Sequence, residues 1–177
     1  GGTGSDTIDY SAISDGDIDG ATGGINVTLN SGSTVVVTVA SGDNDSILNV
    51  ENIIGSANND ILNGDSQSNT LKGGAGADTL FGGGANDSLD GGTGTDTIDY
   101  SSVSKAVKIA LSSYNGTVTV DNNDDGFDLL DEKDIVSAIE NITTGSGNDV
   151  VSGDSNDNTI TTNDGDDTLS GGDGVDK

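Results

Sequence analysis

A nine-residue repeat is the feature of this sequence that most restricts its fold. From Gly55 the chain reads GSANNDILN, GDSQSNTLK, GGAGADTLF, GGGANDSLD and GGTGTDTID without a skipped residue. A second run starts at Thr144 with TGSGNDVVS, GDSNDNTIT, TNDGDDTLS and the incomplete GGDGVDK, and one copy, GGTGSDTID, opens the sequence at Gly1. Repeats of fixed period are typical of solenoids and arrays, so this period has to be interpreted before any local pattern.

Two positions of the repeat are nearly constant. Position eight is aliphatic in all nine complete copies. Position six is asparagine at Asn69 and Asn158, and it is aspartate in the other eight copies: Asp6, Asp60, Asp78, Asp87, Asp96, Asp149, Asp167 and Asp176. A longer period is also present, since GGTGSDTIDYS at residue 1 returns as GGTGTDTIDYS at residue 91, and NVENII near residue 49 returns as AIENIT near residue 138.

The repeats divide the chain into five segments. We predict repeat blocks at 1–9, 55–99 and 144–177, the first being the end of a preceding block, and β-rich inserts at 10–54 and 100–143. The inserts contain alternating, β-branched stretches such as INVTL and TVVVTV, or AVKIAL and TVTV, which are separated by Asn, Ser and Gly. This pattern is typical of strands and hairpins.

Each nonapeptide is expected to form a tight turn followed by a short strand. Glycine at positions one, two or four lets the backbone adopt a positive φ, and Asn58 and Asn156 tolerate that region as well. In the last three residues, such as 79–81, the middle side chain, Leu80, is expected to point inward. If two nonapeptides make one coil, the sequence predicts an all-β parallel β-roll, a β-solenoid with 18-residue rungs, carrying inserted strands or hairpins.

This stacking brings position-six side chains together. Parallel strands lie roughly 4.7 to 4.9 Å apart, so side chains 18 residues apart become neighbours. We expect Asp60 with Asp78, Asp78 with Asp96 and Asp149 with Asp167 along one side, and Asn69 with Asp87 and Asn158 with Asp176 along the other. Carboxylates this close repel each other unless a cation lies between them. Hard oxygen ligands in irregular geometry suit Ca²⁺ better than Mg²⁺.

The small core is a second reason to expect several calcium ions. One buried aliphatic side chain contributes about 2 kcal/mol per nonapeptide, whereas ordering the backbone costs about 1 to 2 kcal/mol per residue. Metal binding is therefore expected to supply folding free energy. A flexible Gly/Asp-rich linker is the alternative, but it does not explain the aliphatic residue at position eight.

Composition excludes several classes of function. The chain has 31 acidic residues against five basic ones, a formal net charge of −26, and no Cys, His, Trp, Met or Pro. Disulfides, Cys or His zinc sites and catalysis that needs an imidazole are therefore excluded. The negative charge disfavours nucleic acid and membrane partners, and no apolar run is long enough to span a bilayer.

The motif GGxGxDxUx, as in GGAGADTLF and GGTGTDTID, resembles the repeat of the RTX, or haemolysin-type, calcium-binding proteins. The resemblance implies a β-roll with calcium in its turns, type I secretion, and folding in external calcium, within a large secreted or cell-surface protein. It also implies the ligands, which are the eight position-six aspartates and carbonyl groups of turn residues: Gly74, Gly76, Gly83, Gly92, Gly94, Gly172 and Gly174.

Two features depart from this pattern. Asn69 and Asn158 put a neutral amide where the family has a carboxylate, so we expect those half-sites to be weaker or empty. DNNDDGFDLLDE at 121–132 matches the EF-hand loop pattern, with Asp121, Asn123, Asp125 and Glu132 in ligand positions. The strand-like TVTV before it argues against an EF-hand, and a short acidic pattern arises easily in so acidic a chain.

The sequence therefore predicts a non-enzymatic, calcium-dependent β-roll that serves as a folding module or rigid spacer. Its expected partners are calcium and neighbouring repeats of the parent chain. An adhesive or self-assembling surface-layer module is the alternative, recognising a glycan or its own copies through open solenoid ends. Glycosidase chemistry by paired carboxylates is not expected, because no tryptophan is present to line a sugar cleft.

Overall fold

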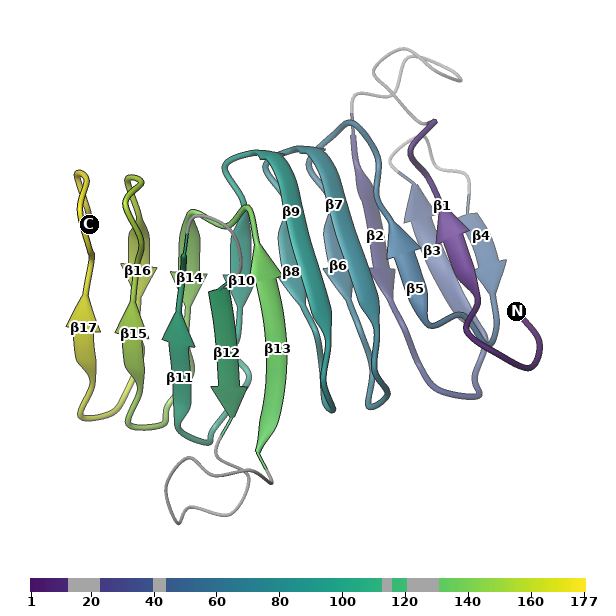
Figure 1. The fold of residues 1–177 in the computed structure, drawn as a ribbon. Coiled ribbons are helices and arrows are strands. Elements are labelled where there is room, and N and C mark those ends of the chain that lie inside the picture. The colour runs from purple at the N-terminus through teal and green to yellow at the C-terminus, as the bar shows by residue number, and fades with distance from the viewer. Residues whose placement is uncertain (13–22, 40–43, 113–115, 121–130) are drawn as a thin grey trace.

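Two facing β-sheets make up the structure, a computed structural model that describes residues 1–12, 23–39, 44–112, 116–120 and 131–177 (Figure 1). The first sheet contains, in spatial order, β1 (Thr7–Asp9), β5 (Asn52–Ile54), β7 (Thr70–Gly76), β9 (Ser88–Gly94), β13 (Glu132–Ser137), β12 (Gly116–Val120), β11 (Val107–Ala110), β15 (Val150–Ser152) and β17 (Thr168–Ser170). The second contains β16 (Thr159–Thr161), β14 (Asn141–Thr143), β10 (Thr97–Asp99), β8 (Thr79–Phe81), β6 (Ile61–Asn63), β2 (Ile25–Thr28), β3 (Val35–Val39) and β4 (Asn44–Ile47).

The repeat strands pair in parallel at a spacing of 18 residues. Thr79 of β8 lies opposite Ile61 of β6 on one side and Thr97 of β10 on the other. The same spacing pairs Thr70 with Ser88 in the other sheet. Successive nonapeptides alternate between the sheets, so each pair makes one coil. The predicted all-β, parallel β-roll architecture is confirmed. Within the described residues, no helix is long and apolar enough to cross a membrane.

Position eight of the repeat forms the core between the sheets. Its side chains are at most 1% exposed in six of the nine complete copies: Leu62, Leu71, Leu80, Leu89, Ile98 and Val151. Ile8 and Ile160 are only partly buried, and Leu169 on β17 is 51% exposed. The core is thus one side chain wide, and it is closed by neighbouring coils on both sides in the middle of the structure but not at β17.

The described strands of the two inserts extend these same sheets. β2 pairs in parallel with β6, and β3 and β4 continue the second sheet by antiparallel pairing. In the first sheet, β11 pairs in parallel with β15, while β13 pairs in parallel with β9, and the antiparallel β12 lies between them (Figure 1). The first strand of each insert, β2 or β11, therefore lies beside a repeat strand that comes later in the chain. The remaining strands of the insert lead back along the roll to the place where the next coil begins.

The second repeat block occupies the sheets in exchanged order, which corrects one expectation. Asp149 and Asp167 precede β15 and β17 in the first sheet, whereas Asp60, Asp78 and Asp96 precede strands of the second sheet. The two sets therefore do not share one side. The chain changes sheet an odd number of times between β1 and its counterpart β10, so every later equivalent strand falls in the opposite sheet.

A tyrosine after the repeat strand anchors each insert. Tyr100 is fully buried, and its hydroxyl donates a hydrogen bond to Asp134 within β13. Tyr10 makes the equivalent bond to Asp45 at 3.0 Å. The Tyr100 ring also packs edge-on against Phe81, with ring centroids 5.5 Å apart. The tyrosines are thus packing residues, each with one polar contact that ties the insert to the roll.

The width of the core sets the cost of removing one position-eight side chain. We predict that Leu80→Ala destabilises the folded chain by about 2 to 5 kcal/mol, because a fully buried leucine leaves a cavity that two short strands cannot close. Leu169→Ala is the matched control at the exposed copy and should cost well under half as much. Urea unfolding in calcium-containing buffer measures both, and equal losses would contradict the description of the core.

Candidate metal centres

The position-six side chains lie in the turns that connect the two sheets. Five of the eight aspartates are at most 4% exposed: Asp60, Asp78, Asp87, Asp96 and Asp149. Asn69 and Asn158 are equally buried, whereas Asp6, Asp167 and Asp176 are half-buried at the outer coils. Burial of an ionised carboxylate is costly unless it is paired or coordinates a metal.

One oxygen of each inner carboxylate is held by the preceding coil. Asp78 Oδ1 accepts the backbone N–H of Asp60 at 2.8 Å, and Asp96 Oδ1 accepts that of Asp78 at 2.8 Å. The same bond joins position six to position six, 18 residues apart, from Asn69 to Asp87, from Asp149 to Asp167 and from Asn158 to Asp176. This ladder fixes the orientation of each carboxylate.

The other oxygen of four of these carboxylates has no partner. Oδ2 of Asp78, Asp87, Asp96 and Asp149 is buried and receives no hydrogen bond. A Cβ placed on Gly73 would lie 2.3 Å from Asp78 Oδ2 and 2.5 Å from the carbonyl oxygen of Gly91, so two acceptors face the same small space. Two acceptor oxygens cannot satisfy each other, but a hard cation satisfies both. The residues therefore fit a calcium ion.

Burial perturbs the pKa of these carboxyls in the metal-free chain. Loss of hydration raises the pKa of Asp78 to about 7, and the charges of Asp60 and Asp96 add to this rise. Burial likewise raises the pKa of Asp87 to about 7, and here Asp134 and Glu132 are the nearby charges. The carboxyl pKa values of Asp60 and Asp96 are also raised by burial.

The seven predicted turn glycines all adopt the left-handed backbone. Their φ angles lie between 99° and 145° at Gly74, Gly76, Gly83, Gly92, Gly94, Gly172 and Gly174. Two related expectations were wrong. Asn58 and Asn156 do not have positive φ, and neither do the position-one glycines. A position-one glycine such as Gly73 is instead required by close contact, because a Cβ there would collide with the carboxylate of its own repeat.

Asn69 and Asn158 differ from the aspartates in their contacts. The side-chain oxygen accepts a hydrogen bond inside its own turn, from Asp65 N–H at 2.8 Å and from Asp154 N–H at 2.9 Å respectively. The side-chain nitrogen donates to the preceding coil, to the carbonyl oxygen of Glu51 at 2.8 Å and of Glu140 at 3.1 Å. Neither side chain has an unpartnered buried atom.

Sequence reasoning missed three acidic residues that act as position-six equivalents. Glu51 accepts the N–H of Asp6 at 2.8 Å, Glu140 that of Asp96 at 2.9 Å, and Asp134 that of Asp87 at 2.9 Å. The recurrence of NVENII as AIENIT was the available signal for the two glutamates. Asp134 lies inside an insert, where no nonapeptide marks it, so only strand pairing identifies its place.

The EF-hand-like pattern is only partly visible. Asp121, Asn123 and Asp125 lie outside the described residues. Glu132 is the first residue of β13. The start of this strand lies beside the turn at 82–87, because the backbone N–H of Lys133 donates a hydrogen bond to Asn86 Oδ1 at 2.8 Å. Among the described residues, no three His, Cys, Asp or Glu side chains converge on one point. Any metal ion held by these residues must therefore take part of its coordination from backbone carbonyl groups.

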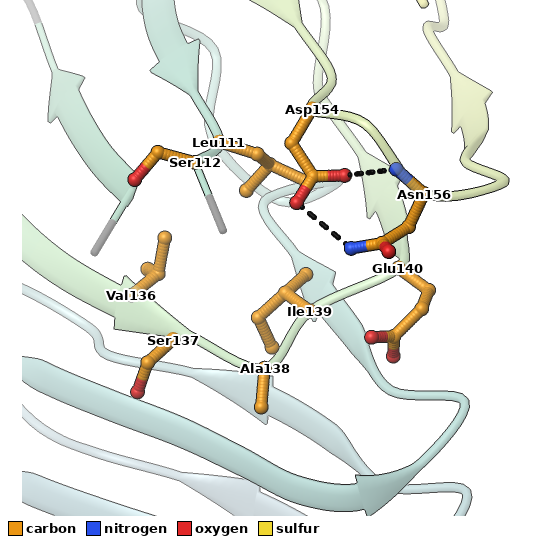
Figure 2. Close-up of a pocket in the computed structure, with 9 residues that line it drawn as sticks. All are labelled: Leu111, Ser112, Val136, Ser137, Ala138, Ile139, Glu140, Asp154 and Asn156. Atoms are coloured by element: carbon orange, nitrogen blue, oxygen red, sulfur yellow. Dashed lines mark hydrogen bonds between the residues drawn. The ribbon is translucent and has the colours of Figure 1, made fainter. Parts of the chain in front are cut away.

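A small cavity lies beside one of the corners that end an insert. Figure 2 shows it between the corner 136–140, residues 111–112 and the turn that carries Asp154 and Asn156. Both carboxylate oxygens of Asp154 accept hydrogen bonds from Asn156, at 2.8 and 2.9 Å. The cavity measures about 40 Å³, far below the roughly 300 to 1,000 Å³ of sites for small organic molecules. The cavity is therefore too small for such a molecule.

Comparison with protein-family models identifies the repeats. The model of the RTX calcium-binding nonapeptide repeat matches in four copies, over residues 52–71, 63–98 and 143–177. These ranges include the two runs of nonapeptides except for residue 99, together with strand β5 and the last residue of β14. No curated protein matches the chain. The matched repeat is a calcium-binding motif, which agrees with the unpartnered oxygens in its turns.

The raised carboxyl pKa values predict how the metal-free fold responds to pH. Asp78 and Asp87 have a pKa of about 7 in the folded state, whereas the ordinary pKa of an aspartate, as in the unfolded chain, is 3.8. Because the folded state binds more protons in this range, its stability is fully present below the unfolded pKa and is lost as pH rises through about 7. Circular dichroism in calcium-stripped buffer between pH 4 and 8 should show the β-signal falling with rising pH, and a rising signal would contradict this.

Proposed function

Because residues 52–98 and 143–177 are RTX calcium-binding nonapeptide repeats, we propose that this chain is a calcium-dependent folding module that becomes a rigid spacer once calcium is bound. The observation that carries the proposal is the buried, unpartnered oxygen on each of Asp78, Asp87, Asp96 and Asp149. A fold that leaves such oxygens unsatisfied is incomplete without a cation. The RTX repeat is itself a structural calcium-binding module rather than a catalytic one.

The ligands we propose combine side chains and backbone. The carboxylates are the eight position-six aspartates, of which the four with an unpartnered oxygen are the strongest candidates. The carbonyl groups come from the turns, including the seven glycines with positive φ, since that conformation aims successive carbonyl oxygens at the inside of the turn. A bound calcium ion supplies positive charge beside the carboxylate oxygens that no donor reaches.

The electrostatic consequence is coupling between calcium and folding. The chain has a net charge of −26, so in the absence of calcium its acidic turns repel one another when coils stack. Burial of one leucine or isoleucine per nonapeptide is weak compensation for ordering nine residues. Binding to the folded state alone then adds directly to its stability.

The setting we propose follows from the same coupling. Extracellular calcium modules bind at about 10⁻⁴ to 10⁻³ M, so a chain of this kind stays unfolded where calcium is scarce and folds where it is abundant. That behaviour suits export of an unfolded chain through a type I secretion channel, with folding in the secreted or cell-surface state. The RTX repeat supports this setting, and the chain's own residues supply the calcium dependence.

A calcium titration followed by circular dichroism tests the proposal. We expect a coil spectrum in chelator and a cooperative gain of β-structure, complete within about 10 mM calcium, a generous margin over the range of extracellular modules. Asp78→Asn should raise the calcium midpoint severalfold, because it removes a buried ligand charge. Asp99→Asn is the matched control on strand β10, outside the turns, and should leave the midpoint unchanged. A wild-type spectrum that does not respond to calcium would rule the proposal out.

Self-association is a second candidate function, favoured by the exposed end of the core. Leu169, a position-eight side chain, is 51% exposed on β17, and β17 is the last strand of its sheet in the described part of the chain. A further coil, either from neighbouring repeats of the parent chain or from a second copy, would bury it. Sedimentation velocity in saturating calcium should show reversible assembly that Leu169→Lys abolishes. If the chain is a monomer at all concentrations, self-association is ruled out and the spacer remains as the function. Glycan recognition would then require a surface other than the β17 edge.

A further inference from the structure

The two position-six asparagines occupy the same structural place. Each follows, by 18 residues, a glutamate that stands in a shortened corner where an insert ends: Asn69 follows Glu51, and Asn158 follows Glu140. In each corner a non-glycine residue, Asn49 or Ala138, adopts φ of 51°. Four residues, 48–51, make the first corner and three, 138–140, make the second, whereas a nonapeptide turn takes six.

The corner changes which backbone group faces the next coil. In the regular ladder the position-six N–H donates forward to the next carboxylate, as Asp60 does to Asp78. At the corners this N–H is already used, because Glu51 donates backward to the carbonyl of Asp6 at 3.2 Å and Glu140 to that of Asp96 at 3.1 Å. Only the glutamate carbonyl oxygen, an acceptor, remains for the next position-six side chain.

An aspartate in that place would put an anionic oxygen against a carbonyl oxygen without a donor. The asparagine nitrogen instead donates to this carbonyl, at 2.8 Å from Asn69 and 3.1 Å from Asn158. We propose that the side-chain amides of Asn69 and Asn158 supply, at the step after each corner, the coil-to-coil hydrogen bond that the position-six N–H supplies elsewhere, so that this step is closed by hydrogen bonds and holds no calcium.

This inference rests on the proposed calcium-dependent folding and adds a restriction to it. Calcium binds only between two stacked six-residue turns. Where the preceding turn is a shortened corner, it offers too few carbonyl groups for an ion, and the asparagine amide makes the contact between the coils instead. The asparagines are then not weakened calcium ligands. They lower the number of ions that the chain needs in order to fold.

The sign of one mutational effect separates the two readings. If Asn69 is a poor calcium ligand, Asn69→Asp improves the site, lowers the calcium midpoint of folding and adds a bound ion. If the amide replaces the ladder hydrogen bond, Asn69→Asp breaks this buried bond and leaves two facing acceptors, so the calcium midpoint rises by about two- to tenfold, the equivalent of losing one such bond. Asn158→Asp provides an independent repeat of the test at the second corner.

Circular dichroism titration and equilibrium dialysis against ⁴⁵Ca provide the two readouts, with Asp78→Asn as the matched reverse exchange. We expect Asn69→Asp to raise the midpoint with no gain in bound ions, and Asp78→Asn to raise it with loss of bound calcium. In the calcium-loaded wild type, scalar coupling by NMR from the Asn69 side-chain amide to the Glu51 carbonyl carbon should be detectable. A lower midpoint or an extra ion in Asn69→Asp overturns the inference, whereas a wild type that ignores calcium overturns the proposed function instead.

Discussion

A buried carboxylate with one satisfied and one unsatisfied oxygen is the interaction on which the rest of this structure depends. The ladder of N–H groups orients each carboxylate along the roll, and the same orientation turns the second oxygen toward a space lined by further acceptors. The turns are therefore shaped by hydrogen bonds that a protein can make alone, yet they are left with a charge that it cannot neutralise. This explains how a chain with a core one leucine wide has a defined architecture that is conditional on a cation.

The inserts show how the roll accommodates other strands without losing its register. Each insert runs ahead along one sheet, returns antiparallel, and re-enters the roll through a corner of three or four residues. The cost of the corner is a missing turn, and the chain compensates with residues of different polarity. The glutamate of the corner accepts the position-six N–H of the preceding coil, which an aspartate accepts in the regular ladder. One coil later, the side-chain nitrogen of an asparagine donates to the glutamate carbonyl oxygen, which a carboxylate would have faced without a donor. Metal sites and metal-free steps therefore follow from the same local accounting of donors and acceptors.

The sequence predicted much of this because the period constrains it strongly. Position eight identified the core, the 18-residue coil followed from two strands per turn of the roll, and the seven glycines predicted as turn residues at positions two and four all have positive φ. Errors arose where a residue type tolerates a conformation without needing it. Asn58 and Asn156 tolerate positive φ but do not adopt it, and the position-one glycines are needed for close contact rather than for their dihedral angles.

What the sequence alone determined is the set of groups that repeat: which side chains enter the core, which carboxylates line up, and that calcium is the ion they suit. What only the tertiary structure decided is what happens where the repeat is interrupted. The exchange of sheets between the two blocks, the position-six place of Asp134 and the direction of the Glu51 and Glu140 N–H groups all depend on how an insert returns to the roll. A local pattern reports the side chains that a segment carries, whereas the partner of a backbone N–H is set by a strand that is distant in sequence, and that partner is known only once the strands are paired.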